Sequence, residues 1–546
     1  MKKKVVALVL LAAMTVSSLA GCGTKNGTSS STDQGSQVVE SSTATENAEL
    51  SEEAAVEEIP EDYFAGTTIT IAVKRKNGDE SSSWNEKEII KMAEEATGIH
   101  VEWIELDQTS ANEKIAAMLM GDDQPDAYLG CLDQTTLSNN MDLFYDLSEE
   151  GLLEKWAPDV VEDYNTEDLW STITWGDGSI LGLITSNTIA AADSWGASIL
   201  SVNQEWLDKL GLPVPTTADE LYNTLVAFRD NDMDGDGDAS NEIPMTFCSG
   251  NWEGDIMLHA NAFGIGGNYT WQPQDSYKNI ENGQVVSTVD TDNFRAFLEF
   301  YHKLAEEGLL DLEGFSQTAD QYSAKRKEKI AGVFTTYTTM LDQGYTPFIY
   351  EGIEGVKPRL TGLVDRFVGQ RSNFCLTADS ENVEVVLHWW NWLSAETERK
   401  LIAYGDPYEI DADGNLWQLP LEEGQPNNVI VGMTNWCPAR TSAERLYYKP
   451  DNIAAGTAAR IQFAEEHKDM YNQEGFPVAY ADAAAEEERT FMEVELYAYL
   501  ESFIANAIVY GVTDDSWAKH LEDLKTVQYY DWLDWYQNFV DEVNAR

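Results

Sequence analysis

TITIAVKRKNGDESSSWNEKEIIKMAEEATGIHVEWIELDQTSANEKIAAMLMGDDQPDAYL, residues 68–129, contains three short runs of closely spaced hydrophobic residues. The runs cover residues 68–73, 101–104 and 125–129. Short hydrophobic runs that are bounded by polar and turn-forming residues predict β-strands. The longer segments between the runs have apolar residues at helical spacing, so they predict helices.

These connecting segments predict helices. Residues 86–96 place their apolar side chains on one helical face and are followed by Gly98, a stop signal, and residues 111–120 predict a second helix. Strands that alternate with helices in this order are typical of a parallel sheet in an α/β fold. Ligands of open parallel sheets bind at the carboxyl ends of strands, so we expect Asp126 and its neighbours to lie near a binding site.

The composition is that of a large folded protein. The chain has 546 residues, and its 17 Trp, 24 Tyr and 18 Phe exclude a chain that is disordered throughout. Its length predicts two to four domains of ordinary size. The 95 Asp and Glu against 35 Lys and Arg give a formal net charge of -60, which repels phosphate backbones and anionic lipid headgroups. We therefore expect no nucleic-acid partner, whereas cations and neutral polar ligands remain compatible with the charge.

The N-terminus has the pattern of a bacterial lipoprotein signal peptide. Residues 2–4 are lysines, and residues 5–19 form an apolar run that is too short to span a membrane comfortably. The run ends at Leu19-Ala20-Gly21-Cys22, which resembles a lipobox. This resemblance implies that residues 1–22 direct export, that Cys22 carries acyl chains such as palmitate, and that the protein is anchored at the extracellular face of the cell membrane. The alternative is an ordinary secretory signal that contains a cysteine.

A change of composition follows the signal. Residues 23–65 are rich in Ser, Thr, Gly, Gln and Glu, with few large apolar side chains. Such a segment cannot bury enough surface to offset its ordering entropy, so it predicts a flexible acidic spacer between anchor and folded body.

A stretch further along the chain carries a resemblance to a known family. Residues 201–217 read SVNQEWLDKLGLPVPTT, in which Leu210-Gly211 ends a short helix and Thr217 with Glu220 forms a capping box. This phrase, together with the lipobox and spacer, resembles the family-1 extracellular solute-binding proteins. Those are the sugar-binding lipoproteins of bacterial ABC importers related to maltose-binding protein.

The resemblance implies a fold of two discontinuous α/β lobes joined by a hinge, with the ligand between them. Residues 66–187 and 372–440 would form the first lobe, and residues 188–371 and 441–546 the second. It also implies a monomer that captures a carbohydrate by hinge closure and delivers it to an ABC transporter permease, without covalent chemistry. The length of the chain favours an oligosaccharide.

An acidic loop predicts a structural calcium site. Carboxylates occupy alternate positions, and Gly237 stands at the sixth place, where a calcium loop turns sharply. The candidate metal ligands are Asp232, Asp234, Asp236, Asp238 and Glu242. Glu242 departs from the template because it stands at the eleventh position and not the twelfth, which leaves its role as a bidentate ligand open. The alternative is a solvated acidic loop. A second acidic stretch, residues 411–415, predicts a hairpin turn without metal.

Aromatic residues suggest where a sugar ring would bind, because its C–H faces stack on indole rings while polar side chains hold its hydroxyls. The candidate ligand-binding residues are Trp84, Asp126, Trp175, Trp195, Trp252, Trp271, Asn435 and Trp436. Core packing or an ordinary surface position explains any one of these tryptophans better than a ligand contact does, but Trp195 and Trp436 lie in loop-like stretches, which favours a ligand role for them. Trp389, Trp390 and Trp392 lie in a helical pattern and predict packing.

No motif supports catalysis. The chain lacks a nucleophile elbow, a His-Glu-x-x-His helix and a phosphate-binding loop, and its six histidines are scattered. We therefore expect a binding protein and not an enzyme. A secreted glycoside hydrolase remains the main alternative, since the spacing of a carboxylate pair is spatial, and a surface glycan adhesin is a third.

Four cysteines remain after Cys22. They are Cys131, Cys248, Cys375 and Cys437, and their separations match no zinc-binding spacing. An exported chain permits two disulfides, although no pairing is favoured, and free buried thiols are equally compatible with the sequence.

Overall fold

A computed structural model describes residues 59–545 with several gaps. The gaps are residues 122, 167, 186–198, 236, 239–240, 268–271, 364–369, 414, 423, 441–445 and 449–454. The signal peptide, Cys22 and most of the segment assigned to the spacer lie outside the described residues. Among the helices that are described, none has both the length and the apolar character needed to cross a membrane.

The first sheet is built from the strands that open the folded body. Its order is β2 (His100–Leu106), β1 (Thr68–Lys74), β3 (Ala127–Leu129), β12 (Gln370–Leu376) and β4 (Leu183–Thr185). Strand β1 pairs in parallel with both β2 and β3, which confirms the predicted parallel arrangement. Strand β12 returns from much later in the chain and runs antiparallel to β3 and β4.

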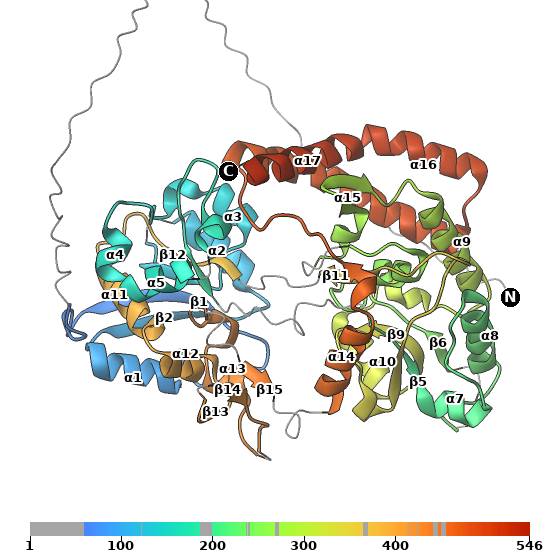
Figure 1. Cartoon of the computed structure of the whole chain (residues 1–546), viewed down its shortest axis with the longest axis horizontal. Coiled ribbons are helices and arrows are strands. Elements are labelled where there is room, and N and C mark those ends of the chain that lie inside the picture. The colour runs from blue at the N-terminus through green and yellow to red at the C-terminus, as the bar shows by residue number, and fades with distance from the viewer. Residues whose placement is uncertain are drawn as a thin grey trace, which may run out of the picture. The chain divides into compact units, whose positions relative to one another are not determined.

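Helices α1 (Glu88–Thr97), α11 (Val383–Ser394) and α12 (Thr397–Tyr404) lie against one another beside this sheet (Figure 1). The predicted packing role of the α11 tryptophans is confirmed, since Trp389 and Trp390 are buried and the Trp390 ring stacks on Phe374 at 4.1 Å. Helix α1 ends as predicted at Gly98, whose φ of 65° is favourable for glycine.

The second sheet has the order β10 (Tyr345–Phe348), β5 (Ile199–Asn203), β9 (Ala331–Thr336) and β6 (Ile243–Met245). Strands β6 and β9 are parallel, and β5 is antiparallel to both β9 and β10. Helices α7 (Gln204–Leu210), α8 (Ala218–Arg229) and α9 (Asp292–Glu306) contribute to the core beside it. Two sheets with helices beside them confirm the α/β class expected from the sequence.

The phrase at residues 201–217 forms the end of β5, helix α7 and the N-cap of α8. Helix α7 ends at Gly211 with φ of 67°, as predicted. The predicted capping box differs in detail: Thr217 Oγ1 accepts from Glu220 N at 3.2 Å, but the Glu220 carboxylate accepts from Thr216 N at 2.8 Å. The acidic side chain therefore caps the residue before the N-cap.

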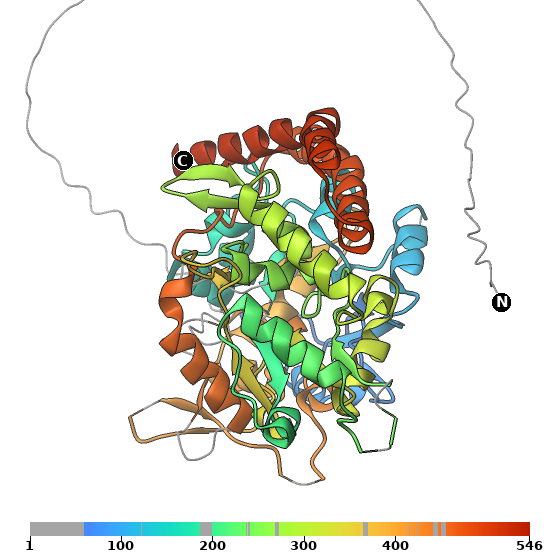
Figure 2. The same ribbon diagram turned by 90° about the vertical axis from the view of Figure 1, so that its right-hand side faces the viewer.

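The C-terminal helices α15 (Ala483–Tyr510), α16 (Asp514–Thr526) and α17 (Tyr529–Ala545) share a core with the second sheet's helices, and α15 packs along α9 (Figure 2). The start of this segment also contacts the first sheet's neighbours. Tyr480 stacks on Trp175 at 4.3 Å, and Gln134 Nε2 in α3 (Gln134–Ser138) donates to Glu486 Oε1 at 2.6 Å.

The remaining elements are short or connect these layers. The helices are α2 (Ala111–Leu119), α4 (Leu152–Trp156), α5 (Pro158–Thr166), α6 (Trp170–Ile173), α10 (Ala319–Lys327), α13 (Asn428–Val431) and α14 (Ala455–Glu466). The strands are β7 (Lys278–Glu281), β8 (Gln284–Ser287), β11 (Leu360–Leu363), β13 (Tyr408–Ile410), β14 (Leu416–Gln418), β15 (Leu446–Tyr448) and β16 (Tyr471–Asn472). Antiparallel pairing of β13 with β14 confirms the hairpin predicted at residues 411–415.

The folded body begins before residue 66. Phe64 packs against Trp156 with ring centroids 5.1 Å apart, and Glu61 pairs with Arg399 at 2.9 Å. The last residues of the segment assigned to the spacer therefore belong to the folded body, because the Phe64 ring and the Glu61 carboxylate contact residues of that body.

Cys131, Cys248, Cys375 and Cys437 are buried, and none of them forms a disulfide among the described residues. Burial raises the pKa of the Cys131 thiol to about 12 and that of Cys375 well above its usual range. These thiols therefore stay protonated at neutral pH and act as small core residues.

A buried histidine makes stability depend on pH. His259 in the 3-10 helix Ile256–Phe263 is fully buried, its Nδ1 lies 3.1 Å from Tyr301 Oη, and burial lowers its pKa to about 3. The unfolded chain, with an ordinary pKa near 6.5, binds the proton more readily. The contribution of neutral, buried His259 to the free energy of unfolding is therefore fully present above pH ~6.5 and is lost as the pH falls towards about 3. The loss is at most about 1.4 kcal/mol for each pH unit.

We expect the stability difference between the wild type and His259→Gln to grow as pH rises from about 4 to about 7. Melting temperatures of both proteins across this range measure it, and other titrating groups cancel in the comparison. A difference that does not change with pH would contradict the prediction.

Candidate functional site

Trp436 lies at the carboxyl edge of the first sheet. The 3-10 helix η7 (Thr434–Trp436) carries the indole, whose Nε1 donates to the carbonyl of Lys74, the last residue of β1, at 2.8 Å. The ring also contacts Gly130, which follows β3, and a Cβ at Gly130 would come within 2.5 Å of the indole. Only glycine at this position lets the indole approach the end of the sheet so closely.

Lys76 covers part of the same indole. Its Nζ lies 4.5 Å from the ring centroid of Trp436, within cation–π range. Burial lowers the pKa of Lys76 to about 8. The ammonium is therefore held in a partly desolvated position two residues beyond β1, where it can donate to a polar ligand.

Asn435 is held in place through its backbone. The Thr185 hydroxyl in β4 donates to the Asn435 carbonyl at 2.7 Å and accepts from Asn373 Nδ2 in β12 at 2.8 Å. Gly130 N donates in turn to the Asn373 carbonyl at 2.9 Å. This chain of bonds connects η7 to β4, to β12 and to Gly130, the residue that follows β3, while the Asn435 side chain remains partly exposed.

The carboxyl edge of the second sheet carries another aromatic pair. Tyr337 directly follows β9 and is 45 % exposed, and its ring centroid lies 5.3 Å from that of Trp252. Glu253 holds the loop that follows β6 and carries Trp252. Its carboxylate accepts hydrogen bonds from Arg326 at 2.6 Å and from the Thr336 hydroxyl at 3.0 Å. The loop therefore positions Trp252 and Tyr337 together at the end of β9.

Each sheet thus has partly exposed aromatic rings and polar groups at the carboxyl ends of parallel strands. Open α/β sheets bind ligands at this edge. An aromatic surface with a few fixed donors and acceptors is suited to a ligand that has apolar faces and hydroxyl groups. These groups can bind such a ligand: Lys76 and Asn435 offer polar groups at the first sheet, and Trp252 with Tyr337 offers aromatic rings at the second.

Two of the predicted ligand tryptophans lie in the core. Trp84 is 1 % exposed, its ring lies 5.0 Å from that of Trp103, and its Nε1 donates to Asp79 at 3.2 Å. Trp175 is also 1 % exposed, beneath Tyr480. Both differ from the expectation because neighbouring side chains cover their rings. Trp195 and Trp271 lie outside the described residues.

Asp126 lies at the amino ends of the parallel strands, whereas Trp436 lies at their carboxyl ends. It precedes β3, and its carboxylate accepts from Thr70 N at 2.7 Å, Ser380 Oγ at 2.6 Å and Asn382 Nδ2 at 3.1 Å. These bonds join β1 to the loop before α11. The position differs from the expected ligand contact, because a residue before a strand lies at its amino end.

Sequence reasoning missed Lys76 and Tyr337. Both follow a strand within two residues, and the carboxyl-end rule, applied to β1 and β9, would have identified them.

The predicted metal loop connects α8 to β6. Carboxylate oxygens of Asp232, Asp234 and Glu242 lie within 4.8 Å of one another. The Asp232 carboxylate accepts from Gly235 N at 2.6 Å and from Gly237 N at 2.9 Å, and Gly237 has φ of 95°. Asp238 is exposed, and Asp236 lies outside the described residues.

The Glu242 carboxylate closes this loop despite its shifted position. Its Oε1 accepts from Met233 N at 2.5 Å and from Asp234 N at 3.3 Å. Its Oε2 is buried and has no hydrogen-bond partner among the described residues. A buried carboxylate oxygen without a donor is costly, and a hard cation would satisfy it, so these residues fit a calcium ion.

The chain is similar in sequence to a transport protein. FusA of Streptococcus pneumoniae, a fructooligosaccharide ABC transporter substrate-binding protein, is 26% identical over 486 residues, which cover 85% of this chain and 88% of FusA. No family model matches the chain.

Solved structures show the same fold. An EF-hand mutant of S. pneumoniae FusA in complex with fructo-nystose has a TM-score of 0.75 at 22% identity, covering 88% of this chain and 100% of that chain. An HMO-binding, ABC-transporter-associated solute-binding protein from Bifidobacterium longum infantis has a TM-score of 0.72 at 20% identity, covering 87% and 98%. These structures confirm the expected fold. The sequence similarity to FusA confirms the resemblance to solute-binding proteins and supports the expectation of a binding protein and not an enzyme.

Proposed function

We propose that this chain, a homologue of the substrate-binding proteins of ABC transporters over most of its length, captures a carbohydrate outside the cell and delivers it to a permease. The observation that carries the proposal is the pair of aromatic groups, Trp436 and Trp252 with Tyr337, at the carboxyl edges of the two sheets. Such rings offer stacking surfaces for sugar C–H faces. The sugars named for the similar proteins are fructooligosaccharides and HMO, which supports an oligosaccharide as the ligand class.

The proposed mechanism is closure of two lobes on the ligand. The first lobe comprises residues 66–187 and 372–440, and the second comprises residues 188–371 and 441–546. The return of β12 to the first sheet supports this division. A ligand that contacts both lobes completes its contacts only in the closed state, so binding shifts the population towards closure. Trp436 and Asn435 would bind from the first lobe, and Trp252 from the second.

The proposal includes a structural calcium ion in the loop at residues 232–242. Asp232, Asp234 and Glu242 would hold it, with Asp236 and Asp238 completing the oxygen set. The Glu242 Oε2 without a hydrogen-bond partner among the described residues supports this assignment, and so does the EF-hand of FusA, which a solved structure has in mutated form. The ion would hold the loop between α8 and β6 in one conformation. Strand β6, which follows this loop, pairs with β9.

The proposed location is the extracellular face of the cell membrane, with acyl chains on Cys22 as the anchor. The lipobox residues Leu19-Ala20-Gly21-Cys22 support it. Incorporation of labelled palmitate into the wild type, and its loss in Cys22→Ser, would test the anchor.

The main experiment is thermal melting of protein that lacks residues 1–22, with kestose, nystose and lacto-N-tetraose as probes. A sugar at about 100 times its Kd stabilises the folded state by about 2.7 kcal/mol, which raises the melting temperature by roughly 5–10 °C. Chromatography of each mixture after incubation tests the alternative function. An upward shift with intact sugar is the expected result. Shortened sugar products would instead show a glycoside hydrolase, and no shift with any sugar would contradict carbohydrate capture.

A further inference from the structure

A pocket lies between two C-terminal helices, and its lining includes none of the sheet-edge residues described above. It has a volume of about 400 Å³ and is formed where α15 turns through Gly511 into α16. Its lining residues include Tyr499, Ser502, Phe503, Asn506, Tyr510 and His520. Ligand pockets for small molecules begin at about this volume, so the space is large enough for one or two sugar rings.

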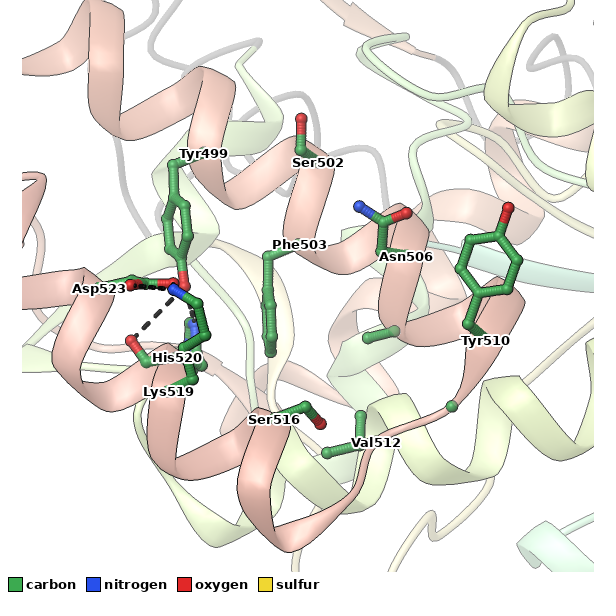
Figure 3. Close-up of a pocket in the computed structure, with 12 residues that line it drawn as sticks. Tyr499, Ser502, Phe503, Asn506, Tyr510, Val512, Ser516, Lys519, His520 and Asp523 are labelled. Atoms are coloured by element: carbon green, nitrogen blue, oxygen red, sulfur yellow. Dashed lines mark hydrogen bonds and ion pairs between the residues drawn. The ribbon is translucent and has the colours of Figure 1, made fainter. Parts of the chain in front are cut away.

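Aromatic stacking fixes the centre of the pocket. Phe503 and His520 stack with ring centroids 3.8 Å apart and an interplanar angle of 6°, and Tyr499 stacks on His520 at 10°. Tyr499 Oη lies 2.9 Å from His520 Nδ1, while His520 Nε2 lies 2.9 Å from the Val289 carbonyl. Figure 3 shows Phe503 between Tyr499 and His520 on one side and Asn506 and Tyr510 on the other. One side of Phe503 is therefore rigidly supported, and the other borders the pocket.

Polar groups at the rim have no assigned role in the fold. The side chains of Ser502, Asn506 and Tyr510 make no hydrogen bond among the described residues, and Tyr510 is 79 % exposed. In contrast, the Lys519 ammonium at the rim is paired with Asp523 at 2.6 Å. The pocket thus presents two hydroxyls and an amide that are available to a ligand, while its nearest ammonium is neutralised.

The absence of charge along this part of the helix points to a neutral ligand. Residues 502–512, SFIANAIVYGV, contain no charged side chain in a protein whose residues are 24% charged and whose formal net charge is -60. A cationic ligand would find more favourable positions elsewhere on the surface, and an anionic one would be repelled. Ring stacking, free hydroxyl and amide groups and electrical neutrality together match a neutral saccharide.

We propose that the α15–α16 pocket is a second, weaker carbohydrate site that binds a ring of a neutral sugar between Phe503 and Tyr510. The site goes beyond the proposed transport function, because it shares no residue with the sheet-edge aromatics. Its open position on the helix surface suits a terminal residue of a longer glycan. Such a contact would hold an extended glycan near the protein before capture.

The test is saturation-transfer NMR and calorimetry with kestose and nystose. Tyr510→Ala removes one wall from an exposed position, so folding is retained, and we expect it to weaken the low-affinity binding class about tenfold. Phe491→Ala is the matched control, since Phe491 is 76 % exposed on the same helix but lies outside the pocket. It should leave both binding classes unchanged.

A Trp436→Ala background separates the two sites. Low-affinity binding that survives Trp436→Ala and is lost on adding Tyr510→Ala would support the pocket. A single binding class in the wild type, or low-affinity binding that Tyr510→Ala leaves intact, would overturn the second site without affecting the proposed transport function. If neither sugar nor lacto-N-tetraose binds the wild type, both proposals fail.

Discussion

Replacement of Trp436 by alanine is expected to weaken binding of the transported sugar by about 30-fold or more. Truncation of a central aromatic anchor costs about 2 kcal/mol or more, and each 1.4 kcal/mol is a factor of ten in Kd. The indole spans the end of β1 and the space beside Gly130, so its loss also releases Lys76 from its cation–π position. Calorimetric titration with the sugar that gives the largest thermal shift measures the effect.

Two further variants distinguish a lost stacking surface from a lost fold. Trp436→Phe retains an aromatic ring but not the Nε1 donor to the Lys74 carbonyl, so it should retain most of the affinity. Tyr510→Ala, in the separate helical pocket, should leave the high-affinity class unchanged. Melting temperatures of the ligand-free variants control for folding. Wild-type affinity in a folded Trp436→Ala protein would contradict the assignment of Trp436 to the site.

Removal of calcium is expected to lower the melting temperature by roughly 5–10 °C. An ion present at about 100 times its Kd stabilises the folded state by about 2.7 kcal/mol through mass action, and each kcal/mol shifts the midpoint of a domain of ~150–250 residues by roughly 2–4 °C. Without the ion, the carboxylates of Asp232, Asp234 and Glu242 repel one another within 4.8 Å. Scanning calorimetry with chelator and with added calcium measures the shift.

The loop residues themselves provide the controls. Asp234→Ala and Glu242→Gln should remove the calcium-dependent increment and melt at the same temperature with and without chelator. Asp413→Ala is the matched control, because Asp413 is an exposed acid in the β13–β14 hairpin. It should respond to calcium as the wild type does. A wild-type protein whose midpoint does not respond to chelator would contradict a structural metal.

Much of the fold could be predicted from local patterns. Strands β1, β2 and β3 and helices α1 and α2 follow from the hydrophobic period. Gly98 and Gly211 mark helix ends because the positive φ at these positions favours glycine over residues that have a Cβ. The candidate calcium loop could be found because its acidic residues are nearly contiguous. Even the shifted Glu242 was identified, since its carboxylate reaches the loop through local backbone contacts.

The candidate binding residues were harder to identify because side chains of the same type can lie in the core or at the surface. Trp84 and Trp436 both belong to short 3-10 helices. Trp103 and Asp79 cover the ring of Trp84, whereas Trp436 remains partly exposed. Asp126 was expected at the carboxyl end of a strand, but it precedes β3 and lies at the amino end. Its carboxylate accepts hydrogen bonds from Thr70 and neighbouring polar groups. Tyr337 directly follows β9, so the rule that ligands bind at the carboxyl ends of strands would have identified it.

The sequence by itself therefore determined the α/β class, the family resemblance and the acidic loop, because each depends on residues that are neighbours in the chain. The tertiary structure decided which aromatic rings stay uncovered, because that depends on packing between segments far apart in sequence. Trp436 reaches the end of β1 only because Thr185 holds the backbone of η7 and Gly130 leaves room for the ring. Those contacts join four separate segments, and no local pattern encodes their meeting.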